Sequence, residues 1–504
     1  MSLLKRSILD ITVFVCGALV MVYEIIGSRI LSPFIGASTY VWTSLIGIIL
    51  AALSLGYWLG GRTADRRPDV RVLAFVILLA AGCVSATILV KDVVLAFISA
   101  APIALELKAV AAAILLFAPA SVALGFVTPY AVKLKMSSLA DAGKTVGRLY
   151  ALSTVGSIAG TFVAGFFLIP FVGSVRTLYI IAGSLIVISA LLVPLSASRF
   201  TSTVITIFVL GIGGSEFTAY ALRRANNLRD IDTEYSRVQV FDTVHAPTSR
   251  PIRVIATDPY FAQSAIFLDG EGLVLDYARF YHLIRHYRPG FRRSLLIGGA
   301  GYTFPREYLN TYPEATIDVV DIDPQMTAIA RKYFGLQDDS RLRSFHEDGR
   351  VFLNQAAAGS YDVILMDAFG SLFSVPYQLT TLEAVREMHR TLSDDGIVIF
   401  NLGSAIRGDA SLMLQAELKT YREVFPVVDA YKVRPDYPDE KLQNVIIVAS
   451  KSQAAAESSD PKIAELLAHR YTADIPLTVP ALTDDLAPVE YYGSIAQNVY
   501  LRDR

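Results

Sequence analysis

Two patterns of apolar and polar positions divide the chain near residue 218. Before that point, long apolar runs follow one another, each of a length that can cross the roughly 30 Å hydrocarbon layer of a membrane. They predict helices at 8–31, 38–60, 71–90, 109–132, 149–172, 176–196 and 200–217. A shorter apolar stretch, 93–105, is expected to form a re-entrant or interfacial helix. The small residues in GSIAGTFVAG (156–165) favour close packing of helices.

After about residue 233 the pattern changes to that of a water-soluble domain. The runs SRVQVFD, PIRVIAT and SAIFLDG predict a small β element over 233–275. From 291 onward, strand-like segments alternate with helical ones: SLLIGG, TIDVVDID, RLRSFHEDG, YDVILMDAF and GIVIFNL, with helices from 304, from 324, near 350 and from 380. Such alternation predicts a parallel sheet with crossover helices.

The expected organisation therefore has three parts. Residues 1–218 form a transmembrane helical domain of about seven spans, 219–290 form a linker and a small β subdomain, and 291–504 form a Rossmann-like α/β domain.

The amino-acid composition agrees with a chain whose first half lies in a membrane and whose second half lies in water. Of its 504 residues, 53% are apolar and only 18% are charged, and all six histidines lie after residue 218. We therefore expect the first half to contact a lipid bilayer. The net charge of −1 provides no concentrated basic face, so nucleic acid is not an expected partner.

Basic residues next to the apolar runs bear on the orientation in the membrane. They precede the first run and follow the second and fourth, which predicts a cytoplasmic N-terminus: Lys5, Arg6, Arg62, Arg66, Arg67, Arg71, Lys133, Lys135, Lys144 and Arg148. Seven crossings would then put the second half outside. Arg223, Arg224 and Arg229 favour the cytoplasm instead, and we expect the second half there. That placement requires that 93–105 also crosses, or that the last run does not cross fully.

Polar residues and glycines follow four of the predicted strands, where ligands bind in such sheets. The first strand ends in Gly298, Gly299, Ala300 and Gly301, which allow a ligand to approach the backbone closely. The candidate binding residues after the next strands are Asp321, Asp323, Glu347, Asp348 and Gly349, and Asp367 follows the fourth. An acid about 20 residues after a glycine loop can accept both hydroxyls of a ribose.

The missing motifs narrow the class of ligand. No Gly-Lys-Ser/Thr follows the glycine loop, which argues against a nucleoside triphosphate as ligand. The sequence also lacks the second glycine motif that is typical of dinucleotide-binding domains. An adenosine without phosphates fits best, and S-adenosylmethionine or a derivative is the usual one. The expected fold of the second half is therefore of the S-adenosylmethionine-dependent methyltransferase type.

The second half resembles the spermidine synthase (polyamine aminopropyltransferase) family, in its membrane-fused bacterial branch. The resemblance covers roughly 233–495 and rests on TEYSRVQVFD, IFLDG, RFYHLI, the glycine loop, VVDIDPQMTAIARKYF, HEDGRVFL, YDVILMDAF and TDDLAPVEYY. The first half is similar to the membrane part of that branch, in EIIGSRILSPFIG and GYWLGGRTADR.

The resemblance implies a role for each site residue. Asp321 would hold the ribose, Asp348 the adenine, and Asp367 would act at the reacting centre, with Tyr281 and His282 near the substrate end. In the family, an amine attacks the carbon beside the sulfonium of decarboxylated S-adenosylmethionine and releases methylthioadenosine. The implied setting is a bacterial inner membrane with small-molecule substrates and no metal, and a homodimer is among the expected assemblies.

The sequence departs from the family at two positions. The family's loop reads Gly-Gly-Gly-Asp-Gly-Gly, and its acid pairs with the ammonium of the aminopropyl tail, whereas this chain has Gly301 there. A second acid, three residues after the catalytic one, is here Gly370. Two carboxylates about 4 Å apart repel by roughly 4 kcal/mol at an effective dielectric of 20. Losing the loop acid thus removes a penalty against the carboxylate of intact S-adenosylmethionine.

Three alternatives to aminopropyl transfer stay open. Intact S-adenosylmethionine could undergo lysis or cyclisation with Asp367 as base, or could donate its methyl group. A different class is a transporter or sensor whose α/β domain only binds the nucleoside. A metal site at His282 and His286 is disfavoured because no third ligand is evident.

Overall fold

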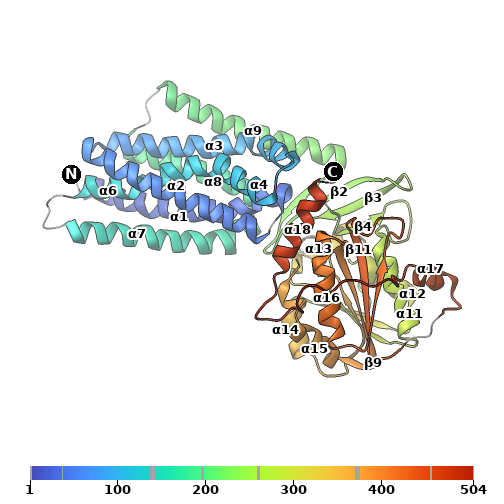
Figure 1. Cartoon of the computed structure of the whole chain (residues 1–504). Helices are drawn as coiled ribbons and strands as arrows, with labels where there is room; N and C mark the ends of the chain where they lie inside the picture. Colours follow the sequence, from blue (N-terminus) through green and yellow to red (C-terminus); the bar gives the residue numbers. More distant parts are fainter. Residues whose placement is uncertain are drawn as a thin grey trace. The chain divides into compact units, whose positions relative to one another are not determined.

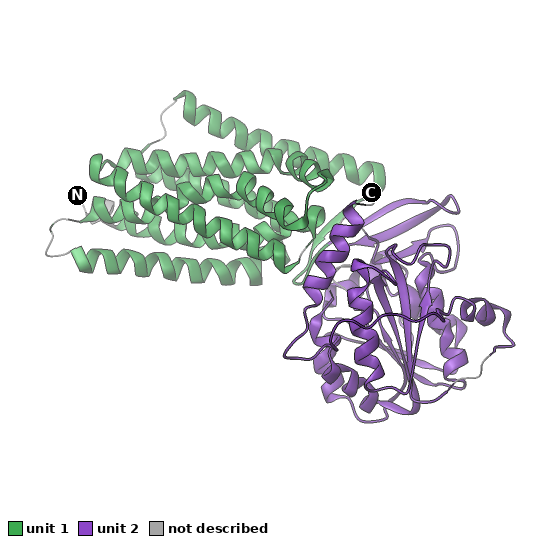
Figure 2. Cartoon of the chain, viewed as in Figure 1, with its two compact units in different colours: residues 1–237 green, residues 238–504 purple. Residues whose placement is uncertain are grey.

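The computed structural model describes residues 3–36, 38–136, 138, 142–194, 198–257, 261–368, 375–453 and 457–502. The chain divides into two compact units, residues 1–237 and 238–504 (Figure 2). The boundary expected at 218 lies within the last long helix of the first unit, α9 (Arg199–Asn226).

The first unit is a bundle of long apolar helices (Figure 1). In chain order these are α1 (Leu3–Ile35), α2 (Thr39–Arg66), α3 (Val70–Ala100), α4 (Leu105–Ala112), the π-helix η1 (Ala113–Phe117), α5 (Ala118–Gly125), α6 (Val127–Lys135), α7 (Ala142–Val163), the π-helix η2 (Ala164–Val172), α8 (Ser174–Leu192) and α9. Within the described residues, seven helical segments are long and apolar enough to span a membrane. The seven predicted spans are therefore confirmed as candidates.

The stretch 93–105 does not form a helix of its own. Helix α3 continues through it to Ala100, and α4 begins at Leu105 after a short turn. The expectation of a separate re-entrant or interfacial helix is wrong, because the apolar pattern of α3 continues past the point where a span of minimal length would end.

Helix α9 packs lengthwise against α3. The rings of Phe75 and Phe200 lie 4.7 Å apart at one end, and Gly211 lies against Ser85 and Ile88 further along. The two helices therefore run side by side in the same direction.

Close helix packing at the predicted small residues is confirmed between α1 and α7. A Cβ atom built on Gly156 would lie 2.0 Å from the carbonyl oxygen of Phe14, and one on Gly160 would lie 2.3 Å from that of Ala18. Only glycine allows the two backbones to approach this closely.

The two ends of the bundle carry different contacts. At the end where α1 begins, Arg148 pairs with Asp10 at 2.8 Å and Lys133 pairs with Asp65 at 2.7 Å. At the other end, the Ser174 amide donates to Asp232 at 2.7 Å. The chain thus leaves the bundle, after α9, at the end opposite to the one where it enters.

A small sheet follows, with strand order β1-β2-β3-β4. Its strands are β1 (Arg229–Asp232), β2 (Arg237–His245), β3 (Arg250–Ala256) and β4 (Ser264–Phe267). The β2–β3 and β3–β4 pairs are antiparallel. This is the β element predicted for 233–275.

The large sheet of the second unit has the order β10-β11-β9-β8-β5-β6-β7. Its strands are β5 (Arg293–Ile297), β6 (Thr316–Val320), β7 (Leu342–Phe345), β8 (Tyr361–Met366), β9 (Leu392–Ser404), β10 (Val427–Lys432) and β11 (Gln443–Ser450). Strands β5 to β9 are parallel, as predicted, whereas β11 is antiparallel to both β9 and β10. The sheet is therefore mixed, because a short connection joins β10 and β11 as a hairpin.

Helices cover both faces of this sheet. They are α10 (Asp276–Arg279), the 3-10 helix η3 (Phe280–Leu283), α11 (Ile284–Tyr287), α12 (Thr303–Thr311), α13 (Pro324–Tyr333), α14 (Gly349–Gln355), the 3-10 helix η4 (Tyr377–Leu379), α15 (Leu382–Thr391), the 3-10 helix η5 (Asp409–Ser411), α16 (Leu412–Arg422), α17 (Pro461–Leu467) and α18 (Val489–Arg502). Leu295 and Ile297 of β5 pack with α14 to α16, while Leu296 packs with α11 to α13. The strand ends between these two layers carry the candidate site.

Candidate active site

The glycine loop after β5 is packed backbone to backbone against the start of the loop after β8. Gly298 has φ +96°, and a Cβ atom there would lie 2.3 Å from the carbonyl oxygen of Asp367. The Asp367 amide donates to the carbonyl of Ile297 at 2.9 Å. Only glycine fits this position, and the close contact fixes Asp367 beside the loop.

Asp321, after β6, binds the glycine loop through its carboxylate. One oxygen accepts the amides of Gly299 and Ala300 at 2.9 and 3.1 Å, and the other accepts the amide of Asp323 at 2.9 Å. Three of the roughly four acceptor positions of the carboxylate are thus used by the protein. Asp321 therefore holds the loop in shape.

Asp323 and Asp348 both cap helices. Asp323, buried, accepts the amide of Gln325 at the start of α13. Asp348 accepts the amides of Arg350 and Val351 at the start of α14, and its second oxygen accepts from Gln378 at 3.1 Å. Capping is a sufficient structural reason for an acid at both places. The half-exposed Asp348 also lies at the strand edge where the sequence predicts an adenine contact.

Glu347 and Gly349 flank Asp348 after β7. Glu347 is half-buried, and Gly349 is buried, with a built Cβ atom only 2.6 Å from Ile297. Gly349 therefore allows α14 to pack on the end of β5.

Asp367 is the most strongly perturbed acid of this edge. Its carboxylate accepts from the Tyr277 hydroxyl at 3.1 Å and from the Asn401 amide at 3.0 Å. Burial raises the pKa of Asp367 to about 7, although these hydrogen bonds act in the opposite direction. The carboxyl can therefore exchange a proton near neutral pH.

Tyr281 lies next to Asp367, but His282 has other partners. The Tyr281 side chain is buried, and burial, together with the nearby Asp367 charge, raises its pKa well above the usual value. His282 Nδ1 hydrogen-bonds the Tyr312 hydroxyl at 2.6 Å and its ring packs on Phe304. Burial lowers the His282 pKa to about 4, so the ring is neutral at pH 7.

Three residues of this site were not predicted from the sequence. Tyr277 and Asn401 hydrogen-bond Asp367 directly, and Asn444 of β11 donates to Asn401 at 2.9 Å. The available signal was an amide within the apolar run GIVIFNL and another at the start of QNVIIVAS. A polar residue at such a place is costly to bury unless it is hydrogen-bonded.

Gly301 faces Ser264 of the small sheet and Phe334, which follows α13. A Cβ atom built on it would lie 2.6 Å from the hydroxyl of Ser264 in β4 and 3.1 Å from the ring of Phe334. Ser264 in turn hydrogen-bonds Thr303 at 3.3 Å. Gly370, the second position that departs from the family, lies outside the described residues.

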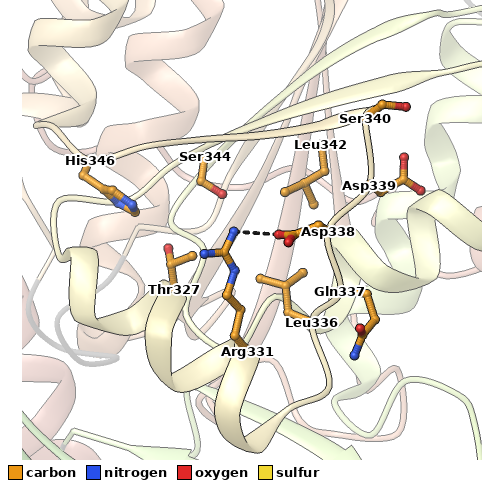
Figure 3. Close-up of a pocket in the computed structure, with 10 residues that line it drawn as sticks. All are labelled: Thr327, Arg331, Leu336, Gln337, Asp338, Asp339, Ser340, Leu342, Ser344 and His346. Carbon is orange, nitrogen blue, oxygen red and sulfur yellow. Dashed lines mark hydrogen bonds and ion pairs between the residues drawn. The ribbon is translucent and has the colours of Figure 1, made fainter.

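A pocket of about 470 Å³ adjoins the loop region without including the predicted site residues. Figure 3 shows Arg331 of α13 paired with Asp338 at 2.9 Å across it. Thr327 and Ser344 of the same lining hydrogen-bond the hydroxyl of Tyr302, at 2.8 and 3.1 Å. The pocket thus shares two side chains with the support of the glycine loop.

Comparisons with known proteins find aminopropyltransferases and also a methyltransferase. Residues 279–458 match the family model described as the spermine/spermidine synthase domain. A polyamine aminopropyltransferase of Vibrio vulnificus is 30% identical over 34% of this chain and 57% of its own length. An eEF1A lysine and N-terminal methyltransferase of Xenopus laevis is 27% identical over 34% of this chain and 25% of its own.

A solved structure with a similar fold is that of a probable spermidine synthase from Corynebacterium glutamicum. It is 22% identical, covers 46% of this chain and 83% of its own, and has a TM-score of 0.40.

Proposed function

The C-terminal half of this chain is a domain of the spermidine synthase (polyamine aminopropyltransferase) family, and we propose from this premise that the protein is a membrane-integrated transferase acting on an adenosyl sulfonium donor. The donor is decarboxylated S-adenosylmethionine or intact S-adenosylmethionine, and the nucleoside product is 5'-methylthioadenosine. Its donor and its amine acceptor are small molecules. The observation that carries the proposal is a carboxyl with a pKa of about 7 at the end of β8, fixed against the glycine loop.

The residues of the site support a direct displacement. The acceptor amine forms a bond to the carbon beside the sulfonium, the carbon–sulfur bond breaks, and its electron pair goes to sulfur. The nitrogen becomes cationic, and Asp367 takes its proton. Because the sulfonium is already a good leaving group, most of the catalysis comes from holding the two reactants in line.

Tyr277 and Asn401 orient the base in this proposal. Each donates to a different oxygen of Asp367, so the carboxylate cannot rotate freely. Asn444 fixes Asn401 in turn. Asp321 and Asp348 are proposed to bind the ribose and the adenine, with Gly298, Gly299 and Gly301 letting the nucleoside reach the backbone.

A second candidate reaction is favoured by Gly301. Without an acid at that position, intact S-adenosylmethionine meets no repulsion from the loop, and Asp367 could remove a proton from it. The resulting intramolecular displacement or elimination also releases methylthioadenosine, but it needs no amine.

Product analysis separates these reactions. The detergent-purified protein is incubated with S-adenosylmethionine or its decarboxylated form, with and without putrescine, and the products are identified by mass spectrometry. Aminopropyl transfer predicts methylthioadenosine only when decarboxylated donor and putrescine are both present. Methylthioadenosine formed without an amine would reject the transferase reaction in favour of the second candidate, and binding without any turnover would reject both.

The membrane placement is a separate part of the proposal. We infer a bacterial inner membrane crossed by all seven helices, since α9 runs beside α3. An odd number of crossings puts the N-terminus and the synthase-like domain on opposite faces. With seven crossings, the basic loops that follow α2 and α6 favour the outer face for that domain, whereas Arg223, Arg224 and Arg229 favour the cytoplasmic position expected from the sequence; we propose the outer face.

A further inference from the structure

We propose that Ser264 and Thr303 determine which sulfonium donor the site accepts, by offering hydroxyl groups where the family has a carboxylate. The donor class that fits is one with a carboxylate on its tail, as in intact S-adenosylmethionine. This inference rests on the proposed function, since it concerns the donor tail of the same site.

The position normally used by the acid is filled by another part of the chain. A Cβ atom on Gly301 would lie 2.6 Å from Oγ and 3.0 Å from Cβ of Ser264. These distances are shorter than van der Waals contact, so no side chain fits at 301 while Ser264 stays in place. Phe334, fully buried, closes the remaining side at 3.1 Å. The loss of the acid is therefore built into the packing of the loop against β4.

The hydroxyl groups of Ser264 and Thr303, which replace the acid, favour a donor tail that carries a carboxylate. Ser264 is buried, Thr303 is half-buried, and their hydroxyls lie 3.3 Å apart. A hydroxyl can donate a hydrogen bond to a carboxylate, whereas a carboxylate side chain can only accept from an ammonium. Both donors carry an ammonium group, so they differ in the tail carboxylate: the swap removes the repulsion against that carboxylate and adds a hydrogen-bond donor for it.

The side chain of Thr303 is well placed for this role because it follows the glycine loop directly. Thr303 begins α12, one residue after Tyr302, whose left-handed conformation (φ 53°) turns the chain from the loop into the helix. A change at Ser264 therefore acts on the loop at Gly301 and on Thr303 together.

The test measures binding of three ligands to the full-length protein in detergent by titration calorimetry: S-adenosylmethionine, its decarboxylated form, and methylthioadenosine, which has no charged tail. We expect the wild type to bind intact S-adenosylmethionine at least as tightly as the decarboxylated donor. Ser264→Ala should weaken intact S-adenosylmethionine roughly tenfold and leave methylthioadenosine unchanged.

The stronger variant is the double substitution Ser264→Gly with Gly301→Asp, which removes the two nearest contacts and leaves the ring of Phe334, at 3.1 Å, to give way slightly to the family's acid. It should reverse the preference toward the decarboxylated donor, whereas Gly301→Asp alone should weaken all three ligands because the new side chain collides with Ser264. An unchanged ratio of the two donors in both Ser264 variants, with methylthioadenosine still bound, would overturn this inference alone. Failure of the wild type to bind methylthioadenosine would instead overturn the proposed function.

Discussion

Asp367 is buried and accepts hydrogen bonds, and these two features change the pKa of its carboxyl group in opposite directions. Burial raises the pKa to about 7, while the hydrogen bonds from Asn401 and Tyr277 lower it. A base of this pKa is mostly deprotonated just above neutrality. We expect kcat/KM to rise with pH through about 7 and to level off above it, as measured by methylthioadenosine release.

Replacing Asp367 by asparagine should separate activity from stability. Turnover should fall by about a hundredfold or more, because the proton acceptor is lost, while methylthioadenosine should still bind. The folded-state pKa lies above the ordinary carboxyl value, so stability from this group is present at low pH and is lost as pH rises through about 7. Asp367→Asn should therefore melt at a higher temperature than the wild type at about pH 8, with a smaller difference at about pH 4. Retained turnover would remove Asp367 from the base role.

Tyr277 offers a milder test of the same site. Tyr277→Phe removes one donor to the carboxylate, so the pKa of Asp367 should rise further and the pH profile should shift upward. We expect kcat/KM at neutral pH to fall roughly tenfold. A matched control is Tyr491→Phe, at an exposed tyrosine whose hydroxyl has no assigned role. A purely structural role for Tyr277 would lower activity without moving the profile.

Sequence reasoning located the acids of the site but not their partners. Asp321, Asp348 and Asp367 follow strands, so their common edge is a consequence of local pattern. Tyr277 and Asn401 reach Asp367 from 90 and 34 residues away. Only the folded chain brings them there, since Asn401 lies in β9 beside β8 and Tyr277 lies in α10. The two bonds that Asp321 accepts from the amides of Gly299 and Ala300 were likewise invisible in the sequence, because they depend on the curl of the glycine loop.

Among the elements, the contact between α1 and α7 depends on glycine. Gly160→Leu would force a side chain into the backbone of Ala18, so the two helices would have to separate. We expect the variant to lose its folded, monodisperse form in detergent at a temperature several degrees lower than the wild type. Gly147→Leu is the control on the same helix, because no atom lies within 4 Å of its Cβ position. Equal melting of the two variants would contradict a close-packing role.

The strands predicted from the sequence were those with long apolar runs followed by polar residues. Strands β5, β6, β8 and β9 met that description and were found, whereas β7, with two apolar residues in four, was predicted from its place in the strand–helix alternation. The hairpin of β10 and β11 was missed, although QNVIIVAS is strongly apolar, because the expectation of strict strand–helix alternation left no place for two successive strands. The continuation of α3 past residue 93 was missed for a related reason, since a span of minimal length was assumed.

For the whole molecule, the count of crossings makes a prediction about sidedness. Reporter domains or single cysteines placed before α1 and after α18 should be accessible from opposite faces of the membrane in intact cells. Labelling of a cysteine in the loop after α2 serves as the internal reference, since that loop should label with the N-terminus. Accessibility of both ends from the same face would show that one of the seven helices does not cross.

The direction shared by α3 and α9 has a consequence for metabolism. An adenosyl sulfonium is made where ATP is plentiful, whereas the proposed seven crossings would start the synthase-like half on the opposite face of the membrane from the N-terminus. Under the proposed function and placement, the sulfonium nucleoside would have to be exported before it could react. Cells that lack such an exporter would then hold a folded protein with nothing to consume.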